Sequence, residues 1–374
     1  MGEQINKRHN TESLQRRLLT SVSMLALLAL VTPLRAEADE TDRPTVWIEL
    51  GGQFERMDGT GEPYAPAFVA AYRDSDVFHP ISPSQADKAP LFAIGAESSI
   101  SFEPTDTNWV LSASILYGRS NGNKHVHHQV TPSAKALDHY YIYGHNIDID
   151  ARFADTRTPQ SEGHTVVDFQ AGKDFGLGMF GRDATSVFSF GVRFAQFASR
   201  ARVNIEARPD LYDSPTKANR LYFHVYTASA HSDRSFRGVG PSLSWKASAP
   251  VVGNRDDGEI DLDWGLDAAV LFGRQKSLTT HGTLARFHNG KYYHPYTALV
   301  YYHPPNPVAR ARFVTVPNAG GFAALSIKYP AARISFGYRG EMFFGAVDGG
   351  WDSAHKQNLS FHGPYATISV GLGG

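Results

Sequence analysis

Long segments of this chain alternate strictly between apolar residues and polar or small residues. Between residues 259 and 276, every even-numbered residue from Ile260 to Phe272 is apolar, whereas the odd-numbered positions include three aspartates. The same alternation recurs over residues 185–197 and 333–345. A period of two places successive side chains on opposite faces of an extended strand. The pattern therefore predicts an all-β fold whose strands have two different environments.

The length of these segments favours a membrane barrel. They run for about 11–14 residues, whereas soluble strands cluster near 5–6 residues and a tilted membrane-crossing strand needs roughly 9–11. Aromatic residues toward the segment ends would form the girdles at the membrane interfaces. The predicted girdle residues are Trp47, Trp109, Tyr117, Trp245 and Tyr338. The alternative is a soluble exported β-domain, which would bury the same apolar faces against each other.

The spacing of the segments predicts an antiparallel up-and-down barrel of about ten strands. The expected strands are 45–54, 90–102, 108–118, 165–175, 185–197, 235–248, 259–273, 319–329, 332–345 and 361–372. Short turns (103–107, 176–184, 248–258, 330–331) alternate with long loops (55–89, 119–164, 198–234, 274–318, 346–360). Short periplasmic turns, long extracellular loops and an even strand number are typical of outer-membrane barrels. Residues 147–151 and 201–207 also alternate. We interpret them as strand extensions beyond the membrane, although twelve or fourteen strands are the alternative.

Composition narrows the function classes. The 374 residues include 34 Gly, 23 Phe and 17 Tyr but no Cys, which excludes a disulfide framework, a thiolate zinc site and a cysteine nucleophile. The formal net charge is -1, whereas a nucleic-acid-binding protein would carry a basic excess.

The N-terminus has the features of a secretory signal peptide. Lys7 and Arg8 begin a positive region, Leu18–Leu34 is mainly apolar, and Ala36-Glu37-Ala38 offers a cleavage site. Cleavage near Ala38 would leave one barrel domain, residues 39–374, with 31 basic against 34 acidic residues. An uncleaved anchor is the alternative. We therefore expect export to the bacterial outer membrane, with periplasmic chaperones, barrel assembly machinery and outer-membrane lipid, including lipopolysaccharide, as partners. The oligomeric state is left open.

Several motifs in the second half of the chain carry a family resemblance. They are Asp168–Phe197, Phe236–Pro241, Leu271–Arg274, Phe336–Glu341 and His362–Tyr365. In this order and spacing they resemble the Legionella-type major outer membrane protein family, over most of residues 165–372 and only weakly over 39–160. The resemblance implies a pore-forming outer-membrane barrel. The chain departs from outer-membrane barrels in general by ending on Gly373-Gly374 and not on an aromatic residue.

Charged and polar residues on the non-lipid parity are the candidate site. They are Asp168, Gln170, Arg193, Asp261, Asp263, Asp267, Arg333, Arg339 and Glu341. In a water-filled lumen they would orient polar solutes and set a weak ion preference. In a narrow barrel they would pair with each other and close the lumen. We expect a porin for small polar solutes or ions. The alternative is a closed structural or adhesive barrel that acts through loops such as Lys291–Tyr296.

Catalytic and metal sites have weaker support. His125-Val126-His127-His128 could share a metal, but no carboxylate spacing accompanies it. Ser120-Asn121-Gly122 is similar to the serine motif of outer-membrane phospholipases but lacks the histidine two residues before the serine. We predict no enzyme activity, no metal and no cofactor, with an outer-membrane hydrolase as the minor alternative.

Overall fold

The computed structural model describes residues 46–59, 91–104, 107–130, 141–142, 145–146, 152–176, 184–208, 221–254, 257–289 and 298–372. The chain divides into two compact units, Met1–Arg43 with Gly374, and Pro44–Gly373. Every described residue belongs to the second unit. The predicted signal peptide, residues 1–38, lies outside the described residues.

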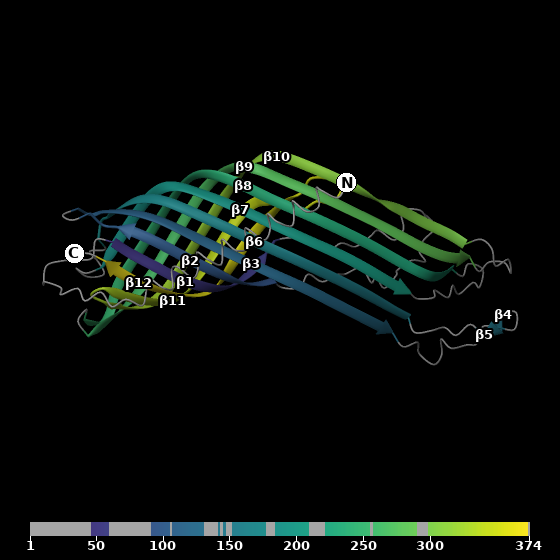
Figure 1. Ribbon diagram of the computed structural model, residues 1–374, viewed down its shortest axis with the longest axis horizontal. Helices are drawn as coiled ribbons and strands as arrows, with labels where there is room; N and C mark the ends of the chain where they lie inside the picture. Colours follow the sequence, from purple (N-terminus) through teal and green to yellow (C-terminus); the bar gives the residue numbers. More distant parts are fainter. Residues whose placement is uncertain are drawn as a thin grey trace, which may run out of the picture. The chain divides into compact units, whose positions relative to one another are not determined.

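Ten antiparallel strands form a closed barrel (Figure 1). They are β1 (Val46–Asp58), β2 (Leu91–Phe102), β3 (Trp109–Val130), β6 (Arg152–Asp174), β7 (Thr185–Arg208), β8 (Leu221–Asn254), β9 (Gly258–Asn289), β10 (Ala298–Tyr329), β11 (Ala332–Asp348) and β12 (Lys356–Leu372). Each barrel strand pairs with the next along the chain, and β1 pairs with β12, from Val46 opposite Leu372 to Asp58 opposite Ser360. The predicted up-and-down barrel of ten strands is confirmed. A separate two-stranded sheet pairs β4 (Tyr141–Ile142) with β5 (His145–Asn146).

The strands fall into two groups by length. β1, β2, β11 and β12 have 12 to 17 residues and form what we call the short wall. β3 and β6 to β10 have 22 to 34 residues and form the long wall. Most of the extra length lies at the ends away from Val46 and Leu372, where Figure 1 shows these strands running past the short wall. The barrel is therefore much taller on one side.

The long wall corrects several sequence predictions. Much of the predicted loops 119–164, 198–234 and 274–318 is strand. The predicted turn 248–258 is also strand as far as Asn254. The extensions carry apolar residues, such as Val203 and Ile205 of β7, only at scattered positions, so the continuous apolar alternation that marks a membrane strand stops before the strand does. The predicted extension at 201–207 lies in β7 and is confirmed, whereas residues 147–151 lie outside the described residues.

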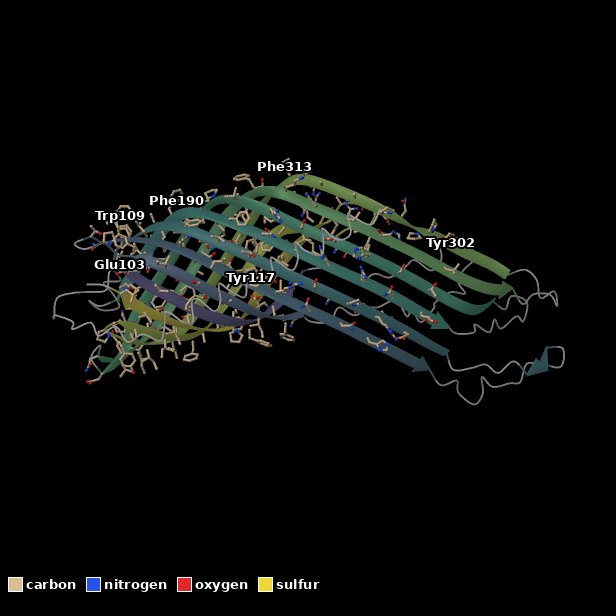
Figure 2. The ribbon with its side chains drawn as sticks, viewed as in Figure 1. Glu103, Trp109, Tyr117, Phe190, Tyr302 and Phe313 are labelled. Carbon is tan, nitrogen blue, oxygen red and sulfur yellow. The ribbon has the colours of Figure 1, made fainter. Side chains whose placement is uncertain are left out.

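Apolar side chains form an outward band around the barrel. On β7, Phe190 and Val192 are 67% and 48% exposed, and on β11, Phe336 is 61% exposed. Figure 2 shows Trp109, Phe190 and Phe313 projecting outward. A barrel that faced water on this surface would expose its largest apolar residues, whereas hydrocarbon accepts them. The band is therefore the surface of a membrane-spanning barrel. Among the described residues, no helix is long and apolar enough to cross a membrane.

Candidate functional site: the barrel interior

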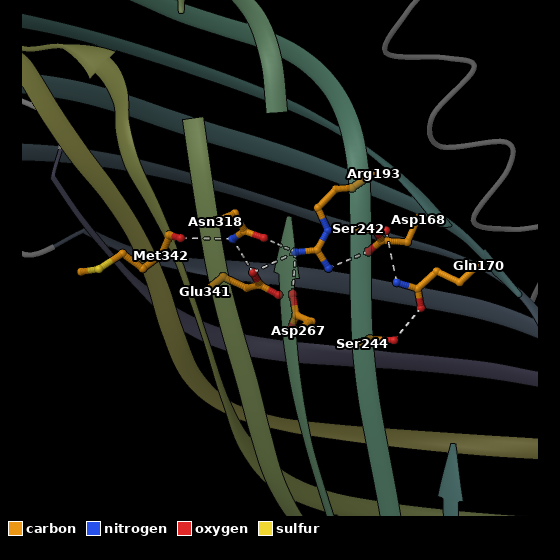
Figure 3. Close-up of polar contacts among 9 residues, drawn as sticks. All are labelled: Asp168, Gln170, Arg193, Ser242, Ser244, Asp267, Asn318, Glu341 and Met342. Carbon is orange, nitrogen blue, oxygen red and sulfur yellow. Dashed lines mark hydrogen bonds and ion pairs between the residues drawn. The ribbon is translucent and has the colours of Figure 1, made fainter. Parts of the chain in front are cut away.

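Arg193 on β7 is the centre of an ionic cluster inside the barrel (Figure 3). Its Nε and Nη2 donate to the two carboxylate oxygens of Asp168 at 2.8 and 2.9 Å, and its Nη1 donates to Asp267 at 2.5 Å. Nη1 also donates to Asn318 and, at 3.3 Å, to Glu341. The Asn318 amide in turn donates to Glu341 at 2.9 Å. One buried cation thus ties together side chains from five strands.

A second pair lies where β11 faces β2. Arg339 Nη1 lies 2.6 Å from Glu97 Oε2, and the guanidinium stands over the rings of Tyr365 and Phe322 at 4.7 and 5.7 Å. The carboxylate neutralises the charge, and the ring faces add a favourable cation–π contact.

A third group lies between β9 and the start of β11. Lys328 Nζ lies 3.7 Å from Asp261, and Arg333 pairs with Asp263. Ser326 Oγ donates to Asp263 at 2.7 Å. These contacts pair two of the three aspartates of the β9 alternation with cations from β10 and β11.

All nine sequence-predicted interior residues lie on the inward parity of their strands, including Gln170, which accepts from Ser244 at 2.8 Å and donates to Ser242 at 3.4 Å. Each of the eight charged residues among them forms an ion pair with another of them or with a neighbouring side chain.

The predicted aromatic girdle is placed only in part. Trp109, Tyr117 and Tyr338 are 50%, 39% and 52% exposed on the outward face. Trp245 is half-buried and stacks on Phe188 at 5.8 Å. Trp47 lies on the parity of the buried residues of β1 and not on the outward parity, so it does not belong to a lipid-facing girdle. Trp47 was predicted to be a girdle residue because it lies near the end of a strand. The parity of a residue, however, decides which face of the sheet its side chain occupies.

A layer of apolar side chains crosses the barrel interior, and every one of the ten barrel strands contributes to it. Its members are Met57, Ala93, Leu116, Val166, Ala195, Phe197, Phe236, Ala269, Leu271, Val316, Phe343, Ala346, Val347, Leu359 and Phe361. None of the sequence-predicted site residues belongs to this layer, because its phenylalanines stand singly on the parity that is otherwise polar. That breach of the alternation was the available signal.

Ring contacts hold the layer together. Phe197 of the long wall meets Phe343 of the short wall edge to face, with ring centroids 4.6 Å apart. Phe361 stacks on His164 at 3.9 Å. The four named side chains are at most 2% exposed. Such contacts stabilise a core beyond the area they bury, so the layer joins the two walls as a packed core does.

Glu55 and His164 form a fully buried pair beneath Phe361. Glu55 Oε2 lies 3.6 Å from His164 Nε2, and both side chains have no exposed surface. Gly118 leaves the space for them, because a Cβ at this position would lie 1.7 Å from Glu55 Oε1 and 2.3 Å from His164 Cε1. A glycine is therefore required where β3 passes the pair.

The connection from β11 to β12 is hydrogen-bonded to the long wall above the apolar layer. We call residues 349–355 the cap loop. Arg310 of the long wall donates to Asp348 at 2.9 Å, to the Gly350 carbonyl at 2.6 Å and to the Trp351 carbonyl at 2.8 Å. Arg234 of β8, two strands away from Arg310, donates to the Gly349 carbonyl at 2.7 Å. Two long-wall arginines thus hold the short wall's loop.

Asp348 organises the cap loop from its other side. Its Oδ1 accepts from the backbone N–H groups of Gly350 and His355 at 3.1 and 3.0 Å. Burial alone would raise the pKa of the Asp348 carboxyl, but the Arg310 hydrogen bond and these two N–H groups hold that pKa below its ordinary value. The carboxylate is therefore ionised at neutral pH, and its charge keeps the loop folded.

Among the described residues, the candidate metal and nucleophile side chains are not grouped into a site. His125 pairs with Asp155 on the adjacent strand. Within the described ranges, no three His, Asp or Glu residues are grouped to hold a metal ion. Ser120 is 2% exposed, and its hydroxyl has no hydrogen-bond partner among the described residues.

Comparisons with known proteins give structural neighbours only. No protein-family model matches the chain, and no curated protein sequence matches it. Solved structures with similarity include the outer membrane protease OmpT from Escherichia coli (8% identity, TM-score 0.41, covering 90% of this chain and 99% of that one). Others are the transport unit of the E. coli autotransporter AIDA-I (7%, 0.21, 93% and 97%) and the P. putida toluene transporter TodX (10%, 0.18, 90% and 91%). At these TM-scores, none of them indicates a shared activity.

Proposed function

We propose that this protein is a closed outer-membrane barrel that works at the cell surface through its long wall. The outward apolar band places the shared part of both walls in hydrocarbon, and the short turns near the termini then face the periplasm. The long wall extends from the opposite end, into the medium outside the cell.

The observation that carries this proposal is the apolar layer. A porin needs a continuous polar path, and ten-stranded barrels lie nearer the filled eight-stranded kind than the 16- to 18-stranded channels. Here each strand contributes to a packed apolar layer, the ion pairs fill one side of it, and the cap loop covers the other. Passive diffusion of small polar solutes, the function expected from the sequence, would require all three to move.

The long wall supplies a surface suited to contact. Near its outer end, a recess of about 550 Å³ lies across the five strands β6 to β10 and is lined by Asp155, Arg157, Asn204, Glu206, Thr227 and Tyr302, among others. Tyr302 is 62% exposed. Exposed tyrosines among polar groups are typical of surfaces that bind other molecules. No catalytic step is part of the proposal.

Conductance in a planar bilayer tests the proposal. The full-length protein is folded in detergent, and heat-modifiable gel mobility confirms the barrel before reconstitution. We expect no stable conductance steps from the wild type. Stable steps whose ion preference changes in Arg193→Ala or Glu341→Ala would contradict the closed barrel and support the porin.

A matched variant shows that the silent barrel is closed and not merely absent from the bilayer. Replacing Phe197 and Phe343 together by Gly removes the rings that join the walls in the apolar layer. If the layer seals the barrel, this variant gives brief openings under conditions in which the wild type is silent. A silent variant with the same insertion efficiency would show that another element closes the interior.

A further inference from the structure

Three cations on the outward face of the long wall have no partner among the described residues. Arg237 of β8 and Arg274 of β9 are directly opposite each other in the register, and Lys276 follows Arg274 on the same face. All three side chains are exposed. None of them has an ion pair or a hydrogen bond with any residue in the described part of the chain. We call these three residues the basic row.

The basic row borders the apolar band. Two residues nearer the chain termini, the register places Phe194, Val239 and Phe272 side by side, and these are 38%, 50% and 57% exposed. Two residues of strand correspond to roughly 7 Å. The cations therefore lie one step outside the hydrocarbon-facing surface.

Aromatic residues flank the basic row at the same level of the register. Phe313 is the β10 partner of Arg274 and is 85% exposed. Tyr117 is linked to Arg237 through the pairings of β3, β6 and β7. Amphipathic aromatic rings concentrate at the boundary between lipid and water, so the row lies at the level of lipid headgroups.

The pairing of the two arginines needs an anion. Like charges directly opposite each other on neighbouring strands destabilise a sheet. Two rows further out on the same surface, Arg200 stands opposite Asp233, with an N–O distance of 3.2 Å. There a carboxylate on the neighbouring strand neutralises the arginine. For Arg237 and Arg274 the structure describes no such carboxylate.

We propose that the basic row binds a phosphate group of lipopolysaccharide in the outer leaflet. Two guanidinium groups offer forked donors that match phosphate oxygens, and the adjacent amine adds a third positive charge. The low dielectric of the neighbouring hydrocarbon strengthens each contact. Arg and Lys can keep their aliphatic stems along an apolar surface while their charged ends reach the headgroups. This inference rests on the proposed location in the outer membrane.

The short wall provides a matched control. Arg56 on β1 is also an exposed outward arginine, but its Nε lies 3.2 Å from Asp58. His362 lies 3.4 Å from the same carboxylate. Because this cation already has an anionic partner, we expect it to contribute little to lipid binding.

The test measures binding of purified lipopolysaccharide to the full-length barrel in a neutral detergent. The variants are Arg237→Gln/Arg274→Gln and the control Arg56→Gln, each checked for heat-modifiable mobility. We expect the double variant to bind at least about tenfold more weakly and to lose the thermal stabilisation by the lipid, while the control matches the wild type. Added salt should weaken wild-type binding more than binding by the double variant.

Two further probes identify the ligand. The same lipid with its phosphates removed should bind the wild type as weakly as intact lipid binds the double variant. Equal binding of the dephosphorylated lipid, or equal binding by the double variant, would overturn the site. Equal stabilisation by inorganic phosphate at the same concentration would overturn the lipid in favour of a soluble anion. These outcomes are independent of conductance, so a conducting barrel that binds lipid through this row would contradict only the closed-barrel function.

Discussion

The short wall and the long wall have the same outward band and differ in what lies beyond it. Short-wall strands of 12 to 17 residues are only slightly longer than a membrane crossing requires. Long-wall strands continue for up to 34 residues. The need to cross the hydrocarbon explains the whole length of the short-wall strands but only part of the length of the long-wall strands. The comparison teaches that all ten strands share the apolar surface that anchors the barrel, whereas the proposed surface function belongs to six of them.

The inner faces of the two walls depend on each other. The phenylalanines of the apolar layer come from both, with Phe197 and Phe236 on the long wall and Phe343 and Phe361 on the short wall. The cap loop adds a second connection above this layer through Arg310. The tall side is therefore supported where it leaves the membrane, although its outer part has no opposing wall.

The largest expected effect comes from breaking the contact between the walls inside the barrel. Phe343→Ala should lower the free energy of unfolding by about 3–5 kcal/mol, because a fully buried ring is replaced by a cavity. Phe344→Ala is the matched control on the next, outward-facing position, where the side chain is 40% exposed. Its cost should be at most about 1 kcal/mol. Urea titration followed by tryptophan fluorescence measures both. Equal costs would show that the layer is not a packed core.

A second prediction tests whether both walls share one hydrocarbon surface. Phe190→Arg on the long wall and Phe336→Arg on the short wall should each cost about 2–4 kcal/mol when the barrel is folded into lipid vesicles. Ser229→Arg, on the exposed outward face of the long-wall extension, should stay within about 0.5 kcal/mol. Folding titrations in vesicles give the three values. A large cost at Ser229 would place the extension in the membrane and remove the distinction between the walls.

The smallest expected effect concerns the cap loop and acid. The folded-state pKa of Asp348 is lowered, so its carboxylate stabilises the loop above the unfolded pKa, about 3.9, and this contribution is lost as the pH falls through the lower folded pKa. The amides of Gly350 and His355 should then lose about 1–2 kcal/mol of local stability against opening. Hydrogen-exchange protection factors at pH 7 and in strong acid measure the loss.

Asp348→Asn is the companion variant, because it removes the charge at every pH. Its two amides should be as weakly protected at pH 7 as the wild-type amides are in acid, with protection in the barrel strands unchanged. Equal protection in the variant and the wild type at pH 7 would show that Arg310 holds the loop without the carboxylate.

The sequence predicts the part of the fold that hydrocarbon imposes. Alternation identified ten strands, and parity placed residues such as Arg193 and Glu341 on the inward face, because a lipid-facing surface must be apolar. The extensions follow another rule: residues 227–235 of β8 are polar or small on both faces, so only their pairing with β7 and β9 makes them strand. The contact of Arg193 on β7 with Asp267 on β9 depends on the register in which each of these strands pairs with β8. No local sequence pattern encodes that register.

The apolar layer was hidden for a related reason. Phe197 and Phe343 are 146 positions apart in the chain and each looks like a single exception to a polar parity. Only closure of the barrel brings such exceptions to one level, where together they form a core. Single breaches of an alternating pattern on several strands are therefore the feature to examine when a barrel sequence leaves the state of its lumen open.

The height of the long wall has a mechanical consequence. Leu221–Arg237 of β8 continues past the outward band, a length of roughly 55 Å at about 3.3 Å per residue. A pull on the outer end would run along the strands, so the hydrogen bonds between them would be loaded together in shear and would not open one after another. Because only one flank stands above the membrane, the same pull would also tilt the barrel in the bilayer. Such a protein would resist a pulling force first through the hydrogen bonds between its strands and then through the apolar band that anchors the barrel in the bilayer.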